Sequence, residues 1–91
     1  MPREIAPAQL AERLRSGLPT RLVDVREDWE REIAKIPGDV HIPMAEVVSR
    51  GAEFRPPEGG LTIIYCHAGV RSMRVADYLE QSGIPDLLSL A

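Results

Sequence analysis

The only cysteine of the chain, Cys66, stands directly after an apolar run, Leu61–Tyr65. A short loop containing Gly69 follows it, and then Arg71 and a helix-like segment. A single cysteine is most often a small buried hydrophobic residue. A cysteine between a strand and a helix, however, lies among unpaired backbone N–H groups and near the positive end of the helix dipole. Both effects favour the thiolate, which is the reactive form, so we interpret Cys66 as a candidate nucleophile.

The residues after the cysteine can form a cradle for an anion. If the backbone wraps around the sulfur, the amides of residues 67–72 point inward, and Gly69 permits the tight turn. Arg71 adds a permanently charged, planar group suited to an oxyanion. The hydroxyl of Ser72 is predicted to cap the next helix, with support of the thiolate as the alternative. A thiolate in such a loop fits attack on an anionic substrate, either a sulfane-sulfur donor or a phosphoryl donor, with a covalent intermediate on sulfur.

Apolar runs and helical periodicity predict how the chain positions this loop. Strands are predicted at Arg3–Ile5, Leu22–Val25, Val40–Ile42, Leu61–Tyr65 and Leu87–Leu90. Helices are predicted at Pro7–Ser16, Glu27–Lys35, Met44–Arg50 and Arg71–Gln81. This alternation indicates an α/β fold with an open parallel sheet and right-handed crossovers. Sites in such sheets form beyond the carboxyl ends of the strands, which is where the cysteine loop lies.

Several side chains outside the loop have a predicted place. Trp29 and Ile33 recur at helical spacing with Ile36, so Trp29 is expected to be a packing anchor. In the segment 44–50, Val47 and Val48 are expected to face inward.

Two polar residues lie on or at the end of predicted strands. Asp24 lies in an apolar run just before Arg26, which favours a structural ion pair or a carboxylate at a helix start, with bracing of the cysteine loop as the alternative. His41 is unaccompanied on its short strand, so it is expected to be structural or exposed, and no metal site is predicted.

Length and composition narrow the classes of function. The 91 residues suit one domain, and the formal net charge of −3 argues against non-specific binding to nucleic acid. No apolar run approaches the length of about 18 residues that a membrane-spanning helix needs. One cysteine permits no internal disulfide, and no signal peptide is evident, so we expect the cytoplasm. No cofactor is expected.

Four segments, in the family's order, resemble single-domain rhodanese-like sulfurtransferases: residues 22–29, 36–43, 63–72 and 78–83. The resemblance covers most of residues 5–90 and implies one rhodanese-like domain over residues 1–91, an open parallel sheet flanked by helices on both faces. It also implies that sulfane sulfur moves from thiosulfate or another persulfide donor, through a persulfide on Cys66, to a thiol or cyanide. The expected partners are therefore a small anionic sulfur donor and a thiol acceptor, or a protein in either role.

The same resemblance implies roles for individual residues. Arg71 would hold the charged end of the donor. The persulfide would be stabilised by the backbone amides of His67, Ala68, Gly69, Val70 and Ser72. Asp24 and Arg26 match a motif beside the loop and are carried over as supporting residues.

The length of the loop separates the two chemistries. Four residues separate Cys66 from Arg71, whereas cysteine phosphatases of related fold resemble C-x5-R, so sulfur is favoured over phosphate.

Two departures from the family pattern bear on the substrate and on possible partners. His67 occupies a position where members that use thiosulfate often carry arginine, which weakens the case for thiosulfate as the physiological donor. The family usually continues past the last strand into a Gly-Gly turn and a further helix. The sequence stops at Leu90-Ala91, so we expect this C-terminal helix to be missing, with an apolar face that favours a partner or weak self-association.

Three other functions remain open at this stage. The domain could be a sulfur-carrier or delivery module that a partner protein loads, because the same residues would serve. A non-catalytic rhodanese-like interaction domain is expected to lose the cysteine or the arginine, and both are present. A phosphatase or oxyanion reductase is disfavoured by the length of the loop.

Overall fold

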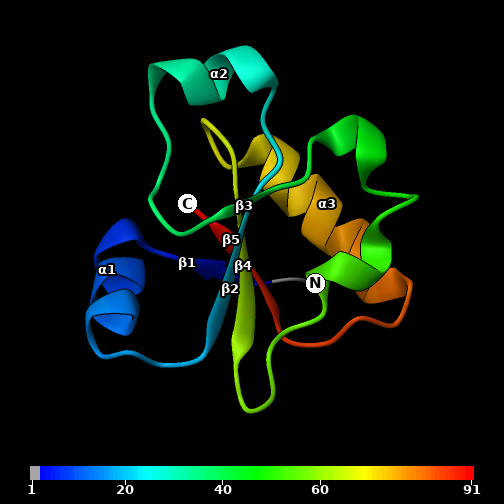
Figure 1. The fold of residues 1–91 in the computed structure, drawn as a ribbon. Helices are drawn as coiled ribbons and strands as arrows, with labels where there is room; N and C mark the ends of the chain where they lie inside the picture. Colours follow the sequence, from blue (N-terminus) through cyan, green and yellow to red (C-terminus); the bar gives the residue numbers. More distant parts are fainter. Residues whose placement is uncertain (1–2) are drawn as a thin grey trace.

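Five parallel strands form one sheet at the centre of the fold (Figure 1). The structure is a computed structural model, and it describes residues 3–91. The strands are β1 (Arg3–Ile5), β2 (Thr20–Asp24), β3 (Val40–His41), β4 (Leu61–Tyr65) and β5 (Leu87–Leu90). Their order across the sheet is β1-β5-β4-β2-β3, so the central strand β4 has a neighbour on either side. The loop that follows β4 therefore leaves the sheet at the middle of its carboxyl edge.

Three α-helices and two short 3-10 helices connect the strands. The α-helices are α1 (Pro7–Arg15), α2 (Asp28–Ile33) and α3 (Val70–Gln81), and the 3-10 helices are η1 (Met44–Glu46) and η2 (Gly51–Phe54). In Figure 1, α1 and α3 lie on opposite sides of the sheet, whereas α2 lies beyond the ends of the strands. Strands β1, β4 and β5 have the predicted bounds.

Each face of the sheet has its own hydrophobic core. On one face Ile64 of β4 packs in a cluster with Val75 and Leu79 of α3. On the other face Ile63 packs in a cluster with Leu10 of α1. Because successive residues of a strand point to opposite faces, β4 is buried on both sides and its sequence is apolar throughout. The predicted α/β class, with helices on both faces of a parallel sheet, is confirmed.

Two leucines of the last strand, β5, are buried, although the sequence predicts an uncovered apolar face near the end of the chain. Leu87 and Leu88 of β5 are only 5% and 8% exposed, and they belong to the cores on opposite faces. The open apolar surface expected at the end of the sheet is therefore absent at these two residues.

The helix predicted after β2 at Glu27–Lys35 is shorter in the structure. Helix α2 has only six residues, and the chain turns to an extended conformation at Ala34. Ile36 is therefore not on the same helix as Trp29 and Ile33, so the three residues share no face. Trp29 is 62% exposed and Ile33 is 77% exposed, and neither is the packing anchor that the periodicity predicts. The buried residue of α2 is instead Glu30.

The segment after β3 also differs from its prediction. A 3-10 turn, η1, takes the place of the α-helix expected at Met44–Arg50. Val47 and Val48 follow η1 in a turn, so the helical spacing that would place both on one inward face is absent. Val47 is buried, as expected, but Val48 is 76% exposed.

Gly60, which precedes β4, lies where a side chain has no room. A Cβ atom at this position would lie 2.8 Å from both the carbonyl carbon and the Cβ of Pro19. We expect Gly60→Ala to lower the free energy of unfolding by about 1–3 kcal/mol, because the two chain segments must separate to admit the methyl group. The measurement is urea denaturation of both proteins.

Gly51→Ala is the matched control, since its Cβ would meet only the side chain of Leu79, at an ordinary 3.6 Å. We expect that change to stay within about 0.5 kcal/mol. Equal denaturation midpoints for the two variants would contradict the prediction.

Candidate active site

The sulfur of Cys66 lies inside a ring of backbone amides at the carboxyl end of β4. The amide N–H groups of Gly69 and Ser72 donate to Sγ over 3.1 and 3.4 Å. Cys66 is partly buried and is a free thiol. Backbone donors thus converge on the sulfur itself.

Gly69 allows the loop to turn into α3. Its φ of +84° lies in the left-handed region, which residues with a Cβ atom rarely adopt. A Cβ at this position would also lie 3.4 Å from the carbonyl oxygen of Leu90, a tight contact. The Gly69 carbonyl then accepts from the amide of Met73 at the start of α3. The positive φ therefore favours glycine at this turn, and the turn in its place directs the Gly69 amide at the sulfur.

The structure places Ser72 differently from its predicted cap position. Gly69 is the N-cap of α3, and Ser72 lies within the first turn, fully buried. Its hydroxyl lies 3.4 Å from Sγ of Cys66, 3.2 Å from the Gly69 carbonyl oxygen and 2.7 Å from the hydroxyl of Ser89. The alternative, a hydroxyl beside the sulfur, matches this geometry.

These contacts act on the acidity of the thiol. Burial by itself raises the pKa of Cys66, because it disfavours the charged thiolate. Hydrogen bonds from the Ser72 hydroxyl and from the amides of Ser72, Ala68 and Gly69 act in the opposite sense. They outweigh burial and hold the pKa of Cys66 below that of an ordinary cysteine. The loop therefore favours the thiolate, the nucleophilic form.

Ser72→Ala removes one of these donors. We expect the rate of Cys66 alkylation by iodoacetamide at pH 7 to fall about tenfold, because a hydrogen bond to a charged group is lost. The full pH profile of the rate should move to higher pH, since the thiolate now forms less readily. The measurement is the alkylation rate between pH 5 and 10 by mass spectrometry.

Ser82→Ala is the matched control, because the Ser82 hydroxyl is exposed at the far end of α3 and donates to the Tyr78 carbonyl. It should leave the profile unchanged. If Ser72→Ala also leaves the profile unchanged, the hydroxyl does not support the thiolate.

The guanidinium of Arg71 is already occupied by a carboxylate. Its two terminal nitrogens donate to the two carboxylate oxygens of Glu30 over 2.7 and 2.8 Å. Glu30 also accepts from the amide of Glu27 over 2.9 Å. The hydrogen bond from Arg71 lowers the pKa of Glu30 to about 2, so the carboxylate is charged at neutral pH. Sequence reasoning missed Glu30, because it is one of several acidic residues in residues 27–32 and nothing local distinguishes it.

The predicted supporting residue Asp24 is the centre of a buried ion network. Its side chain is fully buried and accepts from Nε and Nη2 of Arg26 over 3.0 and 3.1 Å. Arg31 donates to it over 2.9 Å and to the carboxylate of Asp39 over 2.6 Å. Burial alone raises the pKa of Asp24, but the hydrogen bonds from Arg26 and Arg31 outweigh it and lower the pKa.

This network reaches the strand that carries the cysteine. The hydroxyl of Tyr65, the residue before Cys66, donates to Asp39 over 2.5 Å. The guanidinium of Arg26 lies over the Tyr65 ring, 5.3 Å from its centre, close enough for a cation–π interaction. The network thus joins the ends of β2 and β4 and contacts Tyr65, the residue that precedes Cys66.

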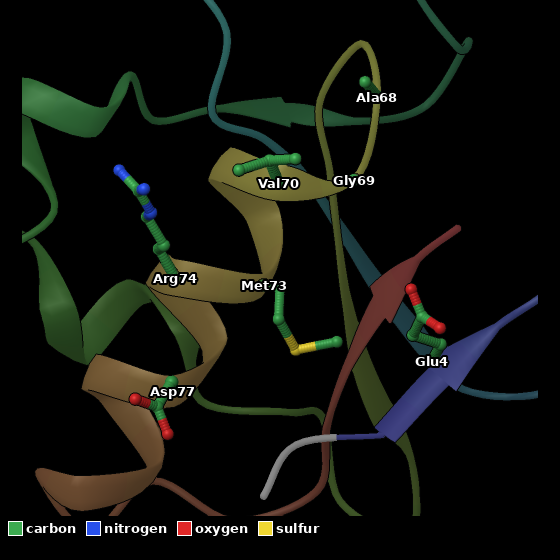
Figure 2. A pocket seen from close by; sticks show the side chains of 7 residues that line it. All are labelled: Glu4, Ala68, Gly69, Val70, Met73, Arg74 and Asp77. Carbon is green, nitrogen blue, oxygen red and sulfur yellow. The ribbon is translucent and has the colours of Figure 1, made fainter.

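Two cavities border the loop on different sides. One of about 640 Å³ is lined by His67 and Arg71 together with residues of α2 and the turn before it. The other, of about 460 Å³, is lined by the loop residues Ala68, Gly69 and Val70 and by Met73 of α3. Figure 2 shows this second cavity, with the Met73 side chain extending from α3 toward the strands. All the loop residues singled out from the sequence thus lie at the sulfur or at one of the two cavities.

Within residues 3–91, no group of three histidine, cysteine or acidic side chains could hold a metal ion. His41 is partly buried, and its Nε2 lies 2.7 Å from the carbonyl oxygen of Arg26. No helix in the described part of the chain is long and apolar enough to cross a membrane.

Comparison with known proteins gives consistent matches. Residues 6–91 match the family model described as the rhodanese-like domain. Of the curated proteins of Bacillus subtilis (strain 168), the "Putative sulfurtransferase YtwF" is 35% identical over 89% of this chain and 77% of its own length. The "Putative sulfur carrier protein YrkF" is 34% identical over 96% of this chain. The chain spans only 46% of the length of YrkF.

A solved structure agrees with the sequence matches. The rhodanese-like domain protein from Staphylococcus aureus superposes with a TM-score of 0.82 at 34% identity, over 94% of this chain and 81% of the other. The family model spans nearly the whole chain, and the fold and the order of its segments agree with it. The chain therefore belongs to the rhodanese-like domain family.

Proposed function

We propose that this domain transfers sulfane sulfur through a persulfide on Cys66. The observation that supports the proposal best is the convergence of the amides of Gly69 and Ser72 on Sγ. These donors stabilise the thiolate before the reaction, and the same donors can hold the charge of a persulfide after it. The relatives named as a sulfurtransferase and as a sulfur carrier point to the same general chemistry.

The proposed reaction has two steps. The Cys66 thiolate attacks the outer sulfur of a donor such as thiosulfate or an organic persulfide, and a new S–S bond forms. The donor's own bond to that sulfur breaks, and its electron pair leaves with the remainder of the donor, which is sulfite in the case of thiosulfate. An acceptor thiolate or cyanide then attacks the outer sulfur of the persulfide and regenerates the Cys66 thiolate. No electrons enter or leave, so no redox cofactor is needed.

The loop geometry favours sulfur over a phosphoryl group. A phosphate would need donors aimed at its oxygen atoms, beyond the sulfur, and a free arginine. Here the Gly69 amide lies 3.1 Å from Sγ, and the Arg71 guanidinium is held by Glu30.

A sulfur-carrier role is the second candidate. It is favoured by the match to YrkF, a protein named as a sulfur carrier, of which this chain resembles a part. In that role a partner protein loads Cys66 and a second protein accepts the sulfur. The two roles use the same persulfide and differ in the rate of multiple turnover with small molecules.

Mass spectrometry of the intact protein tests the proposal. Incubation with thiosulfate, with benzenethiosulfonate or with glutathione persulfide should add about 32 Da, one sulfur atom, to the chain. Cyanide should then remove the added mass and yield thiocyanate. Rapid repeated turnover supports the enzyme, and loading followed by slow turnover supports the carrier. If none of the three donors gives the adduct, the proposed function is wrong.

A further inference from the structure

The cavity of about 640 Å³ beside the loop has balanced charges and an apolar wall. We propose that it selects an organic sulfur donor with a single negative charge, such as a thiosulfonate or an alkyl persulfide, over the small dianion thiosulfate, and that Glu30 sets this preference. The inference rests on the proposed function and specifies the donor for it.

Arg71 has little attraction left for a dianion. Both of its terminal nitrogens are bound to Glu30 in a two-point contact, the arrangement that a sulfonate group would otherwise take. Glu30 is itself 8% exposed and is held by the Glu27 amide, so it cannot swing away without losing a second hydrogen bond. A dianion that enters must either displace this carboxylate or lie beside it.

The charges along the cavity wall compensate one another. Arg26 also lines the cavity, but it is bound to the buried Asp24. Glu27 lines the cavity as well, so the two arginines are matched by two glutamates at the wall and by Asp24 behind it. A dianion would therefore lose its hydration at this wall without gaining an unpaired cation, which is costly.

Part of the cavity lining is apolar. Trp29, Ile33 and Ala34 line the cavity, and the first two side chains are 62% and 77% exposed. An apolar group of a ligand could cover them and remove their surface from water. The volume is within the range of about 300–1,000 Å³ that is usual for sites of small organic ligands and exceeds what thiosulfate requires.

The chemistry balances for such a donor. With benzenethiosulfonate, the Cys66 thiolate attacks the outer sulfur and forms the persulfide. The bond between this sulfur and the sulfonyl sulfur breaks, and its electron pair leaves on benzenesulfinate. The total charge stays the same, and the aromatic ring of the donor is free to lie against Trp29.

Binding can be measured without reaction, because Trp29 is the only tryptophan of the chain. In the Cys66→Ser variant, titration with benzenethiosulfonate at pH 8 should change the Trp29 fluorescence to saturation, after correction with free N-acetyltryptophanamide. Thiosulfate over the same concentration range should change it at least tenfold less. Equal responses to the two donors, or a response to thiosulfate alone, would overturn the inference.

Kinetics of Cys66 loading test the role of Glu30. In Glu30→Gln we expect the KM for thiosulfate to fall about tenfold, because one negative charge is removed and Arg71 is freed. The KM for benzenethiosulfonate should change less than threefold. Glu46→Gln, which removes a charge from a surface pair with Arg50, is the matched control and should change neither value. Equal changes for both donors in Glu30→Gln would mean that Glu30 has only a structural role.

Trp29→Ala tests the apolar wall separately, and it does not depend on the folding of Glu30→Gln. Because Trp29 is exposed, this variant should keep its melting temperature. The KM for benzenethiosulfonate should rise about fivefold or more and that for thiosulfate should not. An unchanged preference would overturn the inference. These outcomes differ from failure of the proposed function, in which no donor loads Cys66 in the unaltered protein.

Discussion

Replacing Asp24 by asparagine is expected to lower the free energy of unfolding by about 3–5 kcal/mol, the cost of breaking a buried ion pair. Asp24 is fully buried and accepts hydrogen bonds from the guanidinium groups of Arg26 and Arg31. An asparagine side chain is uncharged, and its amide nitrogen would direct N–H donors at arginine N–H donors. The change therefore removes the carboxylate that pairs with Arg26, whereas Arg31 keeps its pair with Asp39.

Urea denaturation followed by circular dichroism measures this effect. Glu46→Gln is the control, because Glu46 forms a solvent-exposed pair with Arg50 and such pairs contribute at most about 1 kcal/mol. Asp24→Leu is a useful third variant, since an apolar replacement makes no hydrogen bond to either arginine and should be at least as destabilising as the amide. A loss below about 1 kcal/mol in Asp24→Asn would show that water or neighbouring groups replace the carboxylate.

The five strands along the chain and the position of the cysteine loop could be predicted from the sequence, whereas their order across the sheet was not predicted. β4 and β5 are short, mostly apolar runs preceded by turn residues, Gly59-Gly60 and Pro85-Asp86, so their type and their starts are encoded locally. The loop after β4 could be predicted because a cysteine, a glycine and a helix start follow one another directly. Parallel strands then place this loop at the edge of the sheet where sites form.

Contacts between distant residues could not be predicted in this way. Arg71 and Glu30 are 41 positions apart, and each has other charged residues near it in sequence. Only the packing of α2 beyond the sheet brings them together. The pair of Arg31 with Asp39 could not be predicted either, because it forms only where the chain turns back on itself between α2 and β3.

Helical periodicity gave the wrong answer at Trp29 for a related reason. The spacing of apolar residues describes a helix only while the helix lasts, and α2 ends at Ile33. Beyond that point the chain is extended, and Ile36 packs against the core that contains Tyr65. An exposed tryptophan is then left beside the loop, where it lines a cavity rather than the core.

Cys66→Ser is expected to abolish loading with sulfur from any donor, with a fall of at least about a thousandfold in the rate of thiocyanate formation. The chain has no other cysteine, so no second thiol can replace it. The fold should not change, because a serine hydroxyl at this position can still accept from the amides of Gly69 and Ser72. Intact-protein mass spectrometry and a cyanide assay measure the loss, and thermal melting verifies the fold.

The comparison of this variant with Ser72→Ala separates the nucleophile from its support. Loss of the nucleophile removes the persulfide altogether, whereas loss of the Ser72 hydroxyl slows loading and moves its pH profile, because the amides of Ala68 and Gly69 still lower the pKa of Cys66. Thiocyanate formation that persists in Cys66→Ser would place the chemistry elsewhere. Hydrolysis of an aryl phosphate that disappears in the same variant would instead identify Cys66 as the nucleophile of a phosphoryl transfer.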